Sequence, residues 1–242
     1  MVKGRQIPQY GVDAPGVVIS FYAGALVLLA CGVALFTCVD RVQFLIVVPI
    51  LLGAAVFAVL GTSMLVYSFI GKYRLRDHLL RQRLWRGNEI VLDIGAGRGL
   101  MAIGAAQRAP MGKTIALDIW NAKDLSGNRP EALEENAAIE AVDGRIQIVT
   151  GDARQLDMPD SSIDAVVSVF CFHNIQPAAD RKKAFHEIAR VLKPGGTAMI
   201  ADFPGVERYV DFLRDAGLTV ARAERCKLIA LGGIAGYLLA QK

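Results

Sequence analysis

The stretch Val91-Leu92-Asp93-Ile94-Gly95-Ala96-Gly97-Arg98-Gly99 decides the fold. Apolar, largely β-branched residues around Asp93 predict a buried parallel strand, and the glycines predict a tight turn into a helix that begins near Leu100. Glycine at Gly95 and Gly97 lets the backbone approach a ligand closely, and the positive end of the helix points at the same place. We therefore expect a small-molecule site at the carboxyl edge of an open α/β sheet.

The spacing of these glycines argues against a dinucleotide. The fingerprint G-x-G-x-x-G needs a glycine at position 100, but the chain has Leu100 there, and Gly99 comes one residue early. The sequence also contains no Tyr-x-x-x-Lys pair. An NAD(P)-dependent oxidoreductase is therefore the weaker alternative for this turn.

Composition limits the function classes. The 242 residues carry a net charge of +4, which is too small to indicate binding to nucleic acid. The 4 cysteines form no C-x-x-C motif, so we expect neither a disulfide framework nor a metal site, and a reducing compartment fits. The 53% of hydrophobic residues is concentrated before Gly71.

Two uncharged runs, residues 16–39 and 44–70, account for this excess, and Asp40-Arg41 separates them. Each is long enough to cross a bilayer core of about 30 Å. A signal peptide fits poorly, because no small-residue cleavage site precedes Asp40 and a second run follows at once. A pair of buried helices is the other alternative. We predict that residues 1–71 contain a transmembrane hairpin.

Basic residues set the expected orientation. Lys3 and Arg5 precede the first run, and six basic residues with the single acid Asp77 follow the second, namely Lys72, Arg74, Arg76, Arg81, Arg83 and Arg86. Basic flanks stay on the cytoplasmic side, so we expect both ends of the hairpin and the domain after it to be cytoplasmic. Residues 72–87 are predicted to form a basic juxtamembrane helix, which contacts anionic lipid or is an ordinary solvated helix.

From residue 88 to 242, strand and helix patterns alternate. We expect strands at 89–93, 113–118, 145–150, 163–170, 197–203, 218–229 and 234–240. The helices between them are expected at 100–108, 130–141, 178–192 and 206–216, with Asn128 capping the second. The alternation predicts an α/β domain with a parallel sheet that is covered on both faces.

Acidic residues end or follow three successive strands of this pattern, and Asp93 ends the first of them. Asp118 ends the second predicted strand, where a carboxylate can accept hydrogen bonds from both hydroxyls of a ribose. Gly151-Asp152-Ala153 follows the third, where a carboxylate can accept an adenine amine. A single such residue is explained equally well as a turn aspartate. Acids after three adjoining strands favour a site for one nucleoside.

These segments resemble the methyltransferase type 11 group of class I S-adenosylmethionine (SAM) dependent enzymes, which includes quinone- and sterol-type methyltransferases. The residues that carry the resemblance are Asp93 to Gly99, Asp118, Gly151 to Ala153, Ser168 to Ile175 and Ala189 to Gly196. The resemblance implies SAM as cofactor and a Rossmann-like, doubly wound seven-stranded sheet of order 3-2-1-4-5-7-6 with an antiparallel last strand. The hairpin and the long link at 120–128 depart from the usual pattern.

The resemblance also implies roles for individual residues. The glycine turn borders the methionine and ribose of SAM, Asp118 holds the ribose, and the Phe170 carbonyl binds the ammonium. Ile119 and Trp120 can pack on the adenine, although Trp120 is explained equally well as a core or membrane-interface residue. The implied cofactor-binding residues are Asp93, Gly95, Ala96, Gly97, Asp118, Ile119, Trp120, Asp152, Ala153 and Phe170.

Transfer of a sulfonium methyl needs alignment more than side-chain chemistry, and a base only where the nucleophile must lose a proton. His173 follows the fourth predicted strand and is the candidate base, or else it hydrogen-bonds the loop. We expect a membrane-anchored SAM-dependent methyltransferase that acts on a lipophilic small molecule. A non-catalytic SAM-binding membrane scaffold is the alternative from another class.

Overall fold

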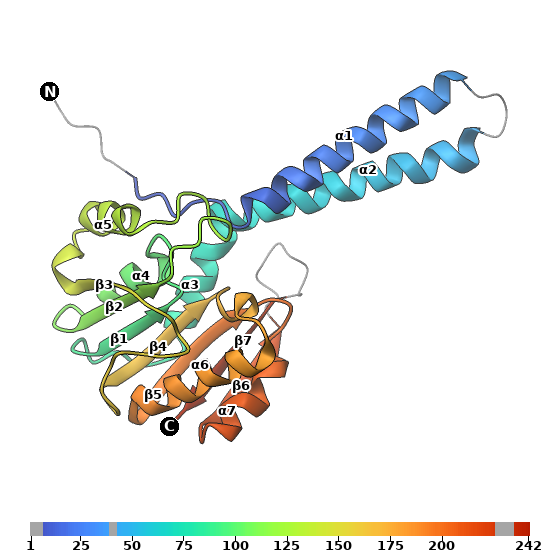
Figure 1. Ribbon diagram of the computed structural model, residues 1–242. Helices are drawn as coiled ribbons and strands as arrows, with labels where there is room; N and C mark the ends of the chain where they lie inside the picture. Colours follow the sequence, from blue (N-terminus) through green and yellow to red (C-terminus); the bar gives the residue numbers. More distant parts are fainter. Residues whose placement is uncertain (1–6, 39–42, 226–234) are drawn as a thin grey trace, which may run out of the picture.

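The computed structural model describes residues 7–38, 43–225 and 235–242, which form a helical hairpin and an α/β domain (Figure 1). Helices α1 (Pro15–Cys38) and α2 (Gln43–Val66) lie side by side and project away from the domain. The predicted Asp40-Arg41 turn, the flanking Lys3 and Arg5, and the stretch 226–234 in the predicted last two strands lie outside the described residues.

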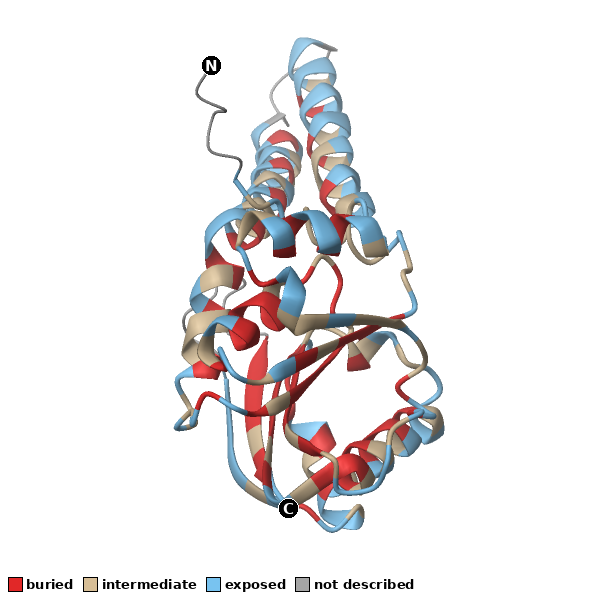
Figure 2. Ribbon diagram, turned by 90° about the vertical axis from the view of Figure 1, so that its left-hand side faces the viewer, coloured by how far each residue is buried: buried red, intermediate tan, exposed pale blue. Residues whose placement is uncertain are grey.

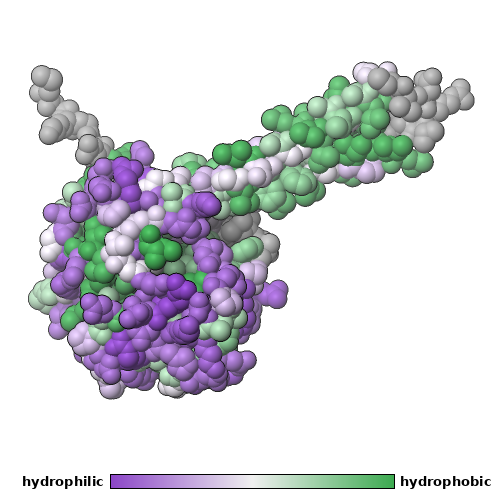
Figure 3. Space-filling view, viewed as in Figure 1, coloured by the Kyte–Doolittle hydropathy of each residue, from purple (hydrophilic) through white to green (hydrophobic). Residues whose placement is uncertain are grey.

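The exposed surface of the hairpin is apolar (Figures 2 and 3). Both helices are long and apolar enough to cross a membrane by length and composition, and only 17% of each apolar window is buried. Small residues lie at the contact between them, where Gly24 faces Phe57 and Gly61 faces Tyr22. Core helices of a soluble domain are mostly buried, whereas most of each apolar window here is exposed.

The helical chain does not end at Gly71. A π-helical turn, Tyr67–Gly71, connects α2 directly to α3 (Lys72–Leu80), which is shorter than the predicted segment 72–87. Leu75, Leu79 and Leu80 of α3 are fully buried in a cluster with strand and helix residues of the domain. The domain therefore covers the apolar side of α3, and the hairpin continues into the domain without a loop.

The domain is built on a seven-stranded sheet of order β3-β2-β1-β4-β5-β7-β6. Strands β3, β2, β1, β4 and β5 are parallel to one another, and β7 is antiparallel to its neighbours β5 and β6. The predicted order and the antiparallel strand are confirmed. The strands are β1 (Ile90–Ile94), β2 (Lys113–Asp118), β3 (Ile146–Thr150), β4 (Ile163–Val169), β5 (Leu192–Asp202), β6 (Thr219–Arg225) and β7 (Gly236–Gln241).

Helices cover both faces of the sheet, as the alternating pattern predicted. Residues of α6 (Ala178–Val191) and α7 (Val210–Asp215) pack on the face that carries Leu92 and Ile94. Helix α4 (Leu100–Arg108), with α3 and α5 (Pro130–Ile139), covers the other face. The predicted cap of α5 is wrong, because Arg129 occupies the N-cap position and the side chain of Asn128 turns elsewhere.

Two boundaries differ from the sequence pattern. Strand β5 begins at Leu192 rather than at 197, because Leu192 already pairs with Ile163 before a register shift, and regular pairing resumes at Thr197. The helix predicted at 206–216 is a 3₁₀ turn, Glu207–Tyr209, followed by α7.

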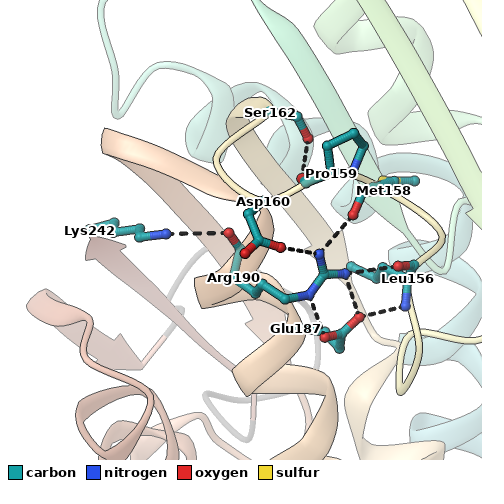
Figure 4. Close-up of polar contacts among 8 residues, drawn as sticks. All are labelled: Leu156, Met158, Pro159, Asp160, Ser162, Glu187, Arg190 and Lys242. Atoms are coloured by element: carbon teal, nitrogen blue, oxygen red, sulfur yellow. Dashed lines mark hydrogen bonds and ion pairs between the residues drawn. The ribbon is translucent and has the colours of Figure 1, made fainter.

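One arginine of the Ala189 to Gly196 motif has a structural role (Figure 4). Arg190 donates to the carbonyl oxygens of Met158 (2.7 Å) and Leu156 (2.8 Å) and to the carboxylates of Asp160 and Glu187 (both 2.7 Å). This fan of charge-assisted bonds holds the loop before β4 against α6. The motif therefore stabilises the fold at the edge of the sheet opposite the glycine turn.

Candidate functional site

The glycine turn after β1 packs too tightly for any side chain. Gly95 has φ +74°, and a Cβ added there would lie 2.5 Å from the Cβ of Cys171. Gly97 has φ +53°, and a Cβ there would lie 2.9 Å from a methyl carbon of Leu125. Backbone conformation and close approach therefore both require glycine at these two positions.

Asp118, at the carboxyl end of β2, is fixed against this turn. Its Oδ2 accepts the backbone N–H of Gly97 at 2.7 Å, and its Oδ1 accepts that of Trp120 at 2.6 Å. The residue is only 8% exposed. The carboxylate therefore lies rigidly beside the bare backbone, the place that a ribose-binding acid requires.

Asp93 is a buried carboxyl group beside the same turn. It is 1% exposed, and neither oxygen makes a hydrogen bond of normal geometry. Burial raises the pKa of Asp93 to about 8, the nearby N–H of Ala102 lowers it, and the charge of Asp118 raises it further. A group of this kind favours a positively charged ligand, since a neighbouring cation stabilises the ionised form.

One thiol shows that the acids converge. Burial raises the pKa of Cys171 well above its usual value, and the charges of Asp118, Asp202, Asp93 and Asp124 add to the effect. The charges of these four carboxylates therefore act on one thiol, although they come from different segments of the chain. Cys171 stays a neutral thiol and is unsuited to be a nucleophile.

The third predicted acid lies outside this buried cluster. The side chain of Asp152 is 40% exposed and accepts hydrogen bonds from Nε and Nη2 of the Arg154 guanidinium, which also binds Asp180. Those bonds to Arg154 hold the pKa of Asp152 below its usual range. Asp152 follows β3, which neighbours β2, so it stays at the rim of the same sheet edge with Ala153 buried behind it.

Two non-glycine residues at this edge have left-handed backbone conformations. Trp120 follows β2 with φ +59°, and Phe170 follows β4 with φ +55°. The indole N–H of Trp120 donates to the Thr150 hydroxyl at 2.8 Å, while Ile119 is 65% exposed. Such outliers persist where the surroundings over-determine them, and they concentrate at functional sites.

On the other side of the site, a histidine is oriented by a buried acid. The Nδ1 atom of His173 lies 2.6 Å from Oδ1 of Asp202, which is fully buried at the end of β5. The Oδ2 atom of Asp202 accepts the backbone N–H of His173 at 2.8 Å and the hydroxyl of Tyr209 at 2.7 Å. Ring, backbone and carboxylate are therefore fixed relative to one another.

Aromatic rings flank this histidine. The ring of Phe170 lies 6.5 Å from that of His173, and the ring of Phe203 lies 6.1 Å from it on an edge-on approach. Phe170 in turn packs on Tyr67 of the hairpin base, at 5.2 Å between ring centroids. The His173 side of the site is apolar and aromatic, in contrast to the acidic side at the glycine turn.

Comparison with known proteins agrees with this geometry. A family model described as a methyltransferase domain matches residues 92–200, from β1 into β5. These residues match a methyltransferase domain, and the order of the sheet agrees with that fold. SAM is the cofactor of such a domain.

Individual relatives share the same segment. A UbiE ubiquinone/menaquinone biosynthesis C-methyltransferase of Pseudomonas fluorescens is 32% identical over 152 residues, covering 57% of this chain and 56% of the relative. A demethylmenaquinone methyltransferase of Thermus thermophilus is 30% identical over 137 residues and covers 57% of each. The chain thus spans little more than half the length of the curated relatives that it matches.

Solved structures share the fold of the methyltransferase domain. A SAM dependent methyltransferase from Aquifex aeolicus matches with TM-score 0.55 at 20% identity, over 68% of this chain and 88% of that one. The [4+2]-cyclase SpnF matches with TM-score 0.58 at 18% identity, over 70% of this chain and 80% of that one. These likenesses concern the fold alone, because function depends on the site.

The acidic side chains at the glycine turn of the methyltransferase domain suit the positive charge of SAM. The carboxyl groups of Asp93 and Asp118 lie at the glycine turn, and Asp93 has no hydrogen-bond partner of normal geometry. SAM carries a sulfonium and an ammonium group, which such a cluster attracts. The pyrophosphate of a dinucleotide is an anion that the same cluster repels.

Sequence reasoning missed two residues of the methyltransferase domain. Asp202 and Tyr209 complete the network around His173, and neither was among the predicted site residues. The signal for Asp202 was present, since it is one more acid at the carboxyl end of a predicted parallel strand. Nothing in the sequence around Tyr209 indicated that its hydroxyl reaches Asp202.

Proposed function

We propose that this protein is a membrane-anchored, SAM-dependent methyltransferase that acts on a lipophilic aromatic acceptor of the quinone type. The observation that carries the proposal is the pairing of two features at one sheet edge. A buried acidic cluster at the glycine turn suits a cationic nucleoside, and an oriented His173 lies next to it.

The chemistry divides between the cofactor and the chain. SAM supplies an activated methyl group on a sulfonium. The chain holds the cofactor through Asp118 and the glycine turn, and His173 removes a proton from the acceptor. Asp202 binds Nδ1 of His173, which keeps the proton there and leaves Nε2 as the basic atom.

The acceptor class follows from the surroundings of His173. Phe170 and Phe203 approach the imidazole edge-on and offer apolar ring surface beside it. A flat aromatic molecule packs well on such rings. The relatives from Pseudomonas fluorescens and Thermus thermophilus carry names that refer to ubiquinone and menaquinone biosynthesis, which supports an aromatic quinone precursor as the acceptor.

The hairpin supports a membrane location. Helices α1 and α2 have the length and composition of spans, and their apolar surface is exposed. The basic residues that flank the hairpin in the sequence support a cytoplasmic position for both of its ends and for the methyltransferase domain. An enzyme held in this way meets a lipophilic acceptor at the surface of the bilayer.

Two experiments test the proposal. Calorimetry with the full chain in lipid nanodiscs should show binding of SAM and of S-adenosylhomocysteine (SAH) but not of NADH. Binding of NADH in their place would overturn the assignment. In the second experiment, membranes containing the protein are incubated with methyl-labelled SAM and extracted with organic solvent.

Label in the lipid extract that depends on the protein, and that His173→Ala removes, supports the proposed transfer. SAM binding without transfer to any fraction would favour a scaffold that binds SAM and transfers nothing. Label confined to water-soluble products would keep the methyltransferase and overturn the lipophilic acceptor.

A further inference from the structure

The segment before the hairpin pairs with the long link that follows β2. We call residues Tyr10–Ala14 the strap and residues Asn121–Asn128 the link. Val12 donates its N–H to the Ser126 hydroxyl at 2.7 Å and accepts the N–H of Ser126 at 3.1 Å. Ala14 donates to the carbonyl oxygen of Asp124 at 2.9 Å. The strap therefore holds the link along much of its length.

The strap is anchored in turn to the base of the hairpin. Lys72 is 3% exposed, and its ammonium donates to the carbonyl oxygens of Tyr10 (2.8 Å) and Gly11 (2.5 Å) and to the carboxylate of Asp13 (3.2 Å). The hydroxyl of Ser68 donates to the same carboxylate at 2.9 Å. The buried ammonium of Lys72 donates to three acceptors, so removing its charge should destabilise this part of the protein.

The link reaches both halves of the site. The side chain of Leu125 lies against Gly97, where it leaves no room for a Cβ. Burial chiefly raises the pKa of Asp124. The hydrogen bond from Asn121 and the charge of His173 lower this pKa, and the charge of Asp118 raises it. The link therefore packs against the glycine turn, and Asp124 within it is in electrostatic range of His173.

One side chain of the link has an unused acceptor. Asn128 is 8% exposed, and its amide nitrogen donates to Oδ1 of Asp118 at 3.4 Å and to the carbonyl oxygen of Asn121 at 3.3 Å. Its Oδ1 is buried and has no partner. Both neighbours of the nitrogen are acceptors, so the amide cannot be turned round to satisfy the oxygen.

We propose that Asn128 is a further cofactor-binding residue, whose Oδ1 accepts a ribose hydroxyl beside Asp118, and that the hairpin base positions it through the strap. The inference rests on the proposed use of SAM. A ribose hydroxyl is a donor, and the buried oxygen is an acceptor next to the carboxylate that holds the ribose. In this view Lys72 is a positioning residue for the cofactor site.

The first test compares SAH with its 2′-deoxy and 3′-deoxy analogues, by calorimetry on the full chain in nanodiscs. Asn128→Ala should bind SAH about 5- to 10-fold more weakly than the wild type, because it loses one hydrogen bond to a buried acceptor. One of the two deoxy analogues lacks the ribose hydroxyl that binds Asn128. The wild type and Asn128→Ala should have the same affinity for that analogue. Lys123→Ala, an exposed change on the same link, should leave all three affinities unchanged.

The outcomes of this test separate two failures. If the wild type does not bind SAH, the proposed function fails and the inference fails with it. If the wild type binds and Asn128→Ala binds equally well, only the inference is overturned. The same holds if Asn128→Ala loses the same factor with SAH and with both deoxy analogues, because no ribose hydroxyl is then involved.

The second test concerns the hairpin base. Lys72→Met should weaken SAH binding several-fold, Lys72→Arg should restore part of the loss, and Lys72→Met should add nothing in the Asn128→Ala background. Ser68→Ala, which removes two neutral-donor bonds to Asp13 and leaves the Lys72 ammonium in place, serves as a milder variant if Lys72→Met does not fold. Additive losses would show that Lys72 does not act through Asn128 and would overturn the positioning role.

Discussion

The two halves of the site are built in opposite ways. Around the glycine turn, both oxygens of Asp93 and Oδ1 of Asn128 are buried without a hydrogen bond of normal geometry. Around His173, the oxygens of Asp202 accept from the ring, from two backbone N–H groups and from the Tyr209 hydroxyl. The first half has unused hydrogen-bonding capacity that a polar ligand can satisfy, whereas the second is satisfied within the protein and directs one side chain.

This difference teaches which half depends on the ligand. A ligand that supplies hydrogen-bond partners to buried polar atoms stabilises the half that contains them, because a buried polar atom without a partner raises the free energy of the protein. A half with a complete network is rigid before anything binds, and its task is orientation. We therefore expect substitutions in the first half to change cofactor affinity, and substitutions in the second to change the rate of transfer.

The largest expected effect is in the second half. Asp202→Asn removes the charge that orients His173 and places an amide among groups that all donate to it. The rate of label transfer to the lipid extract should fall at least about 100-fold, while the SAH affinity changes less than about 2-fold. Asp215→Asn, an exposed acid on α7, is the matched control. An unchanged rate in Asp202→Asn would rule out His173 as the base.

The next effect is in the first half. Asp118→Ala removes the carboxylate that we expect to accept two ribose hydroxyls, and it leaves the N–H of Gly97 without its partner. SAH binding should weaken about 100-fold in calorimetry, whereas His173→Ala should leave it within about 2-fold. Equal losses of SAH binding in the two variants would contradict the division between the halves.

A pH dependence sharpens the comparison. The raised pKa of Asp93, about 8, means that the free protein holds a proton there at neutral pH. A cationic ligand favours the ionised form, so binding releases this proton and SAM affinity should rise with pH up to about 8. The slope should approach but not exceed about tenfold per pH unit.

Asp93→Asn is the control for this pH profile, since an amide does not titrate. Calorimetry across this pH range should show a flat SAM affinity for Asp93→Asn. A wild-type affinity that falls as pH rises would mean that the ligand prefers the protonated carboxyl and would contradict the assignment of Asp93.

The smallest effect is at the periphery of the network. Tyr209→Phe removes one donor to Asp202 but leaves its bonds to His173 in place. The transfer rate should fall about 3- to 10-fold with no change in SAH affinity. A loss as large as that of Asp202→Asn would mean that the hydroxyl has a more direct part in the reaction.

Much of the fold could be read from the sequence, because the signals were local. The glycine turn, the alternation of strands and helices and the two apolar runs each follow from neighbouring residues. The boundaries that failed depend on partners far away in the chain. Strand β5 begins early because Leu192 pairs with Ile163, and the amide of Asn128 donates to Asp118 while Arg129 takes the N-cap position of α5.

The site was predicted in part for the same reason. Asp118 and the glycines lie where the pattern placed them, and Asp93 joins them through the parallel pairing of β1 with β2. Asp152 fits the strand-end rule, but Arg154, two residues on, binds its carboxylate. The spacing of the sequence predicts which residues lie at the strand ends. It does not predict which hydrogen-bond partner a side chain has there.

The sequence by itself determined which residue types gather at the carboxyl edge, because the order of strands and turns is a property of the local chain. Only the tertiary structure decided that Asp202 and Tyr209 orient His173, and that Lys72 joins the hairpin base to the strap over the site. These contacts join positions that are 7 to 62 residues apart, and hydrogen bonds across such separations are selected by packing rather than by pattern.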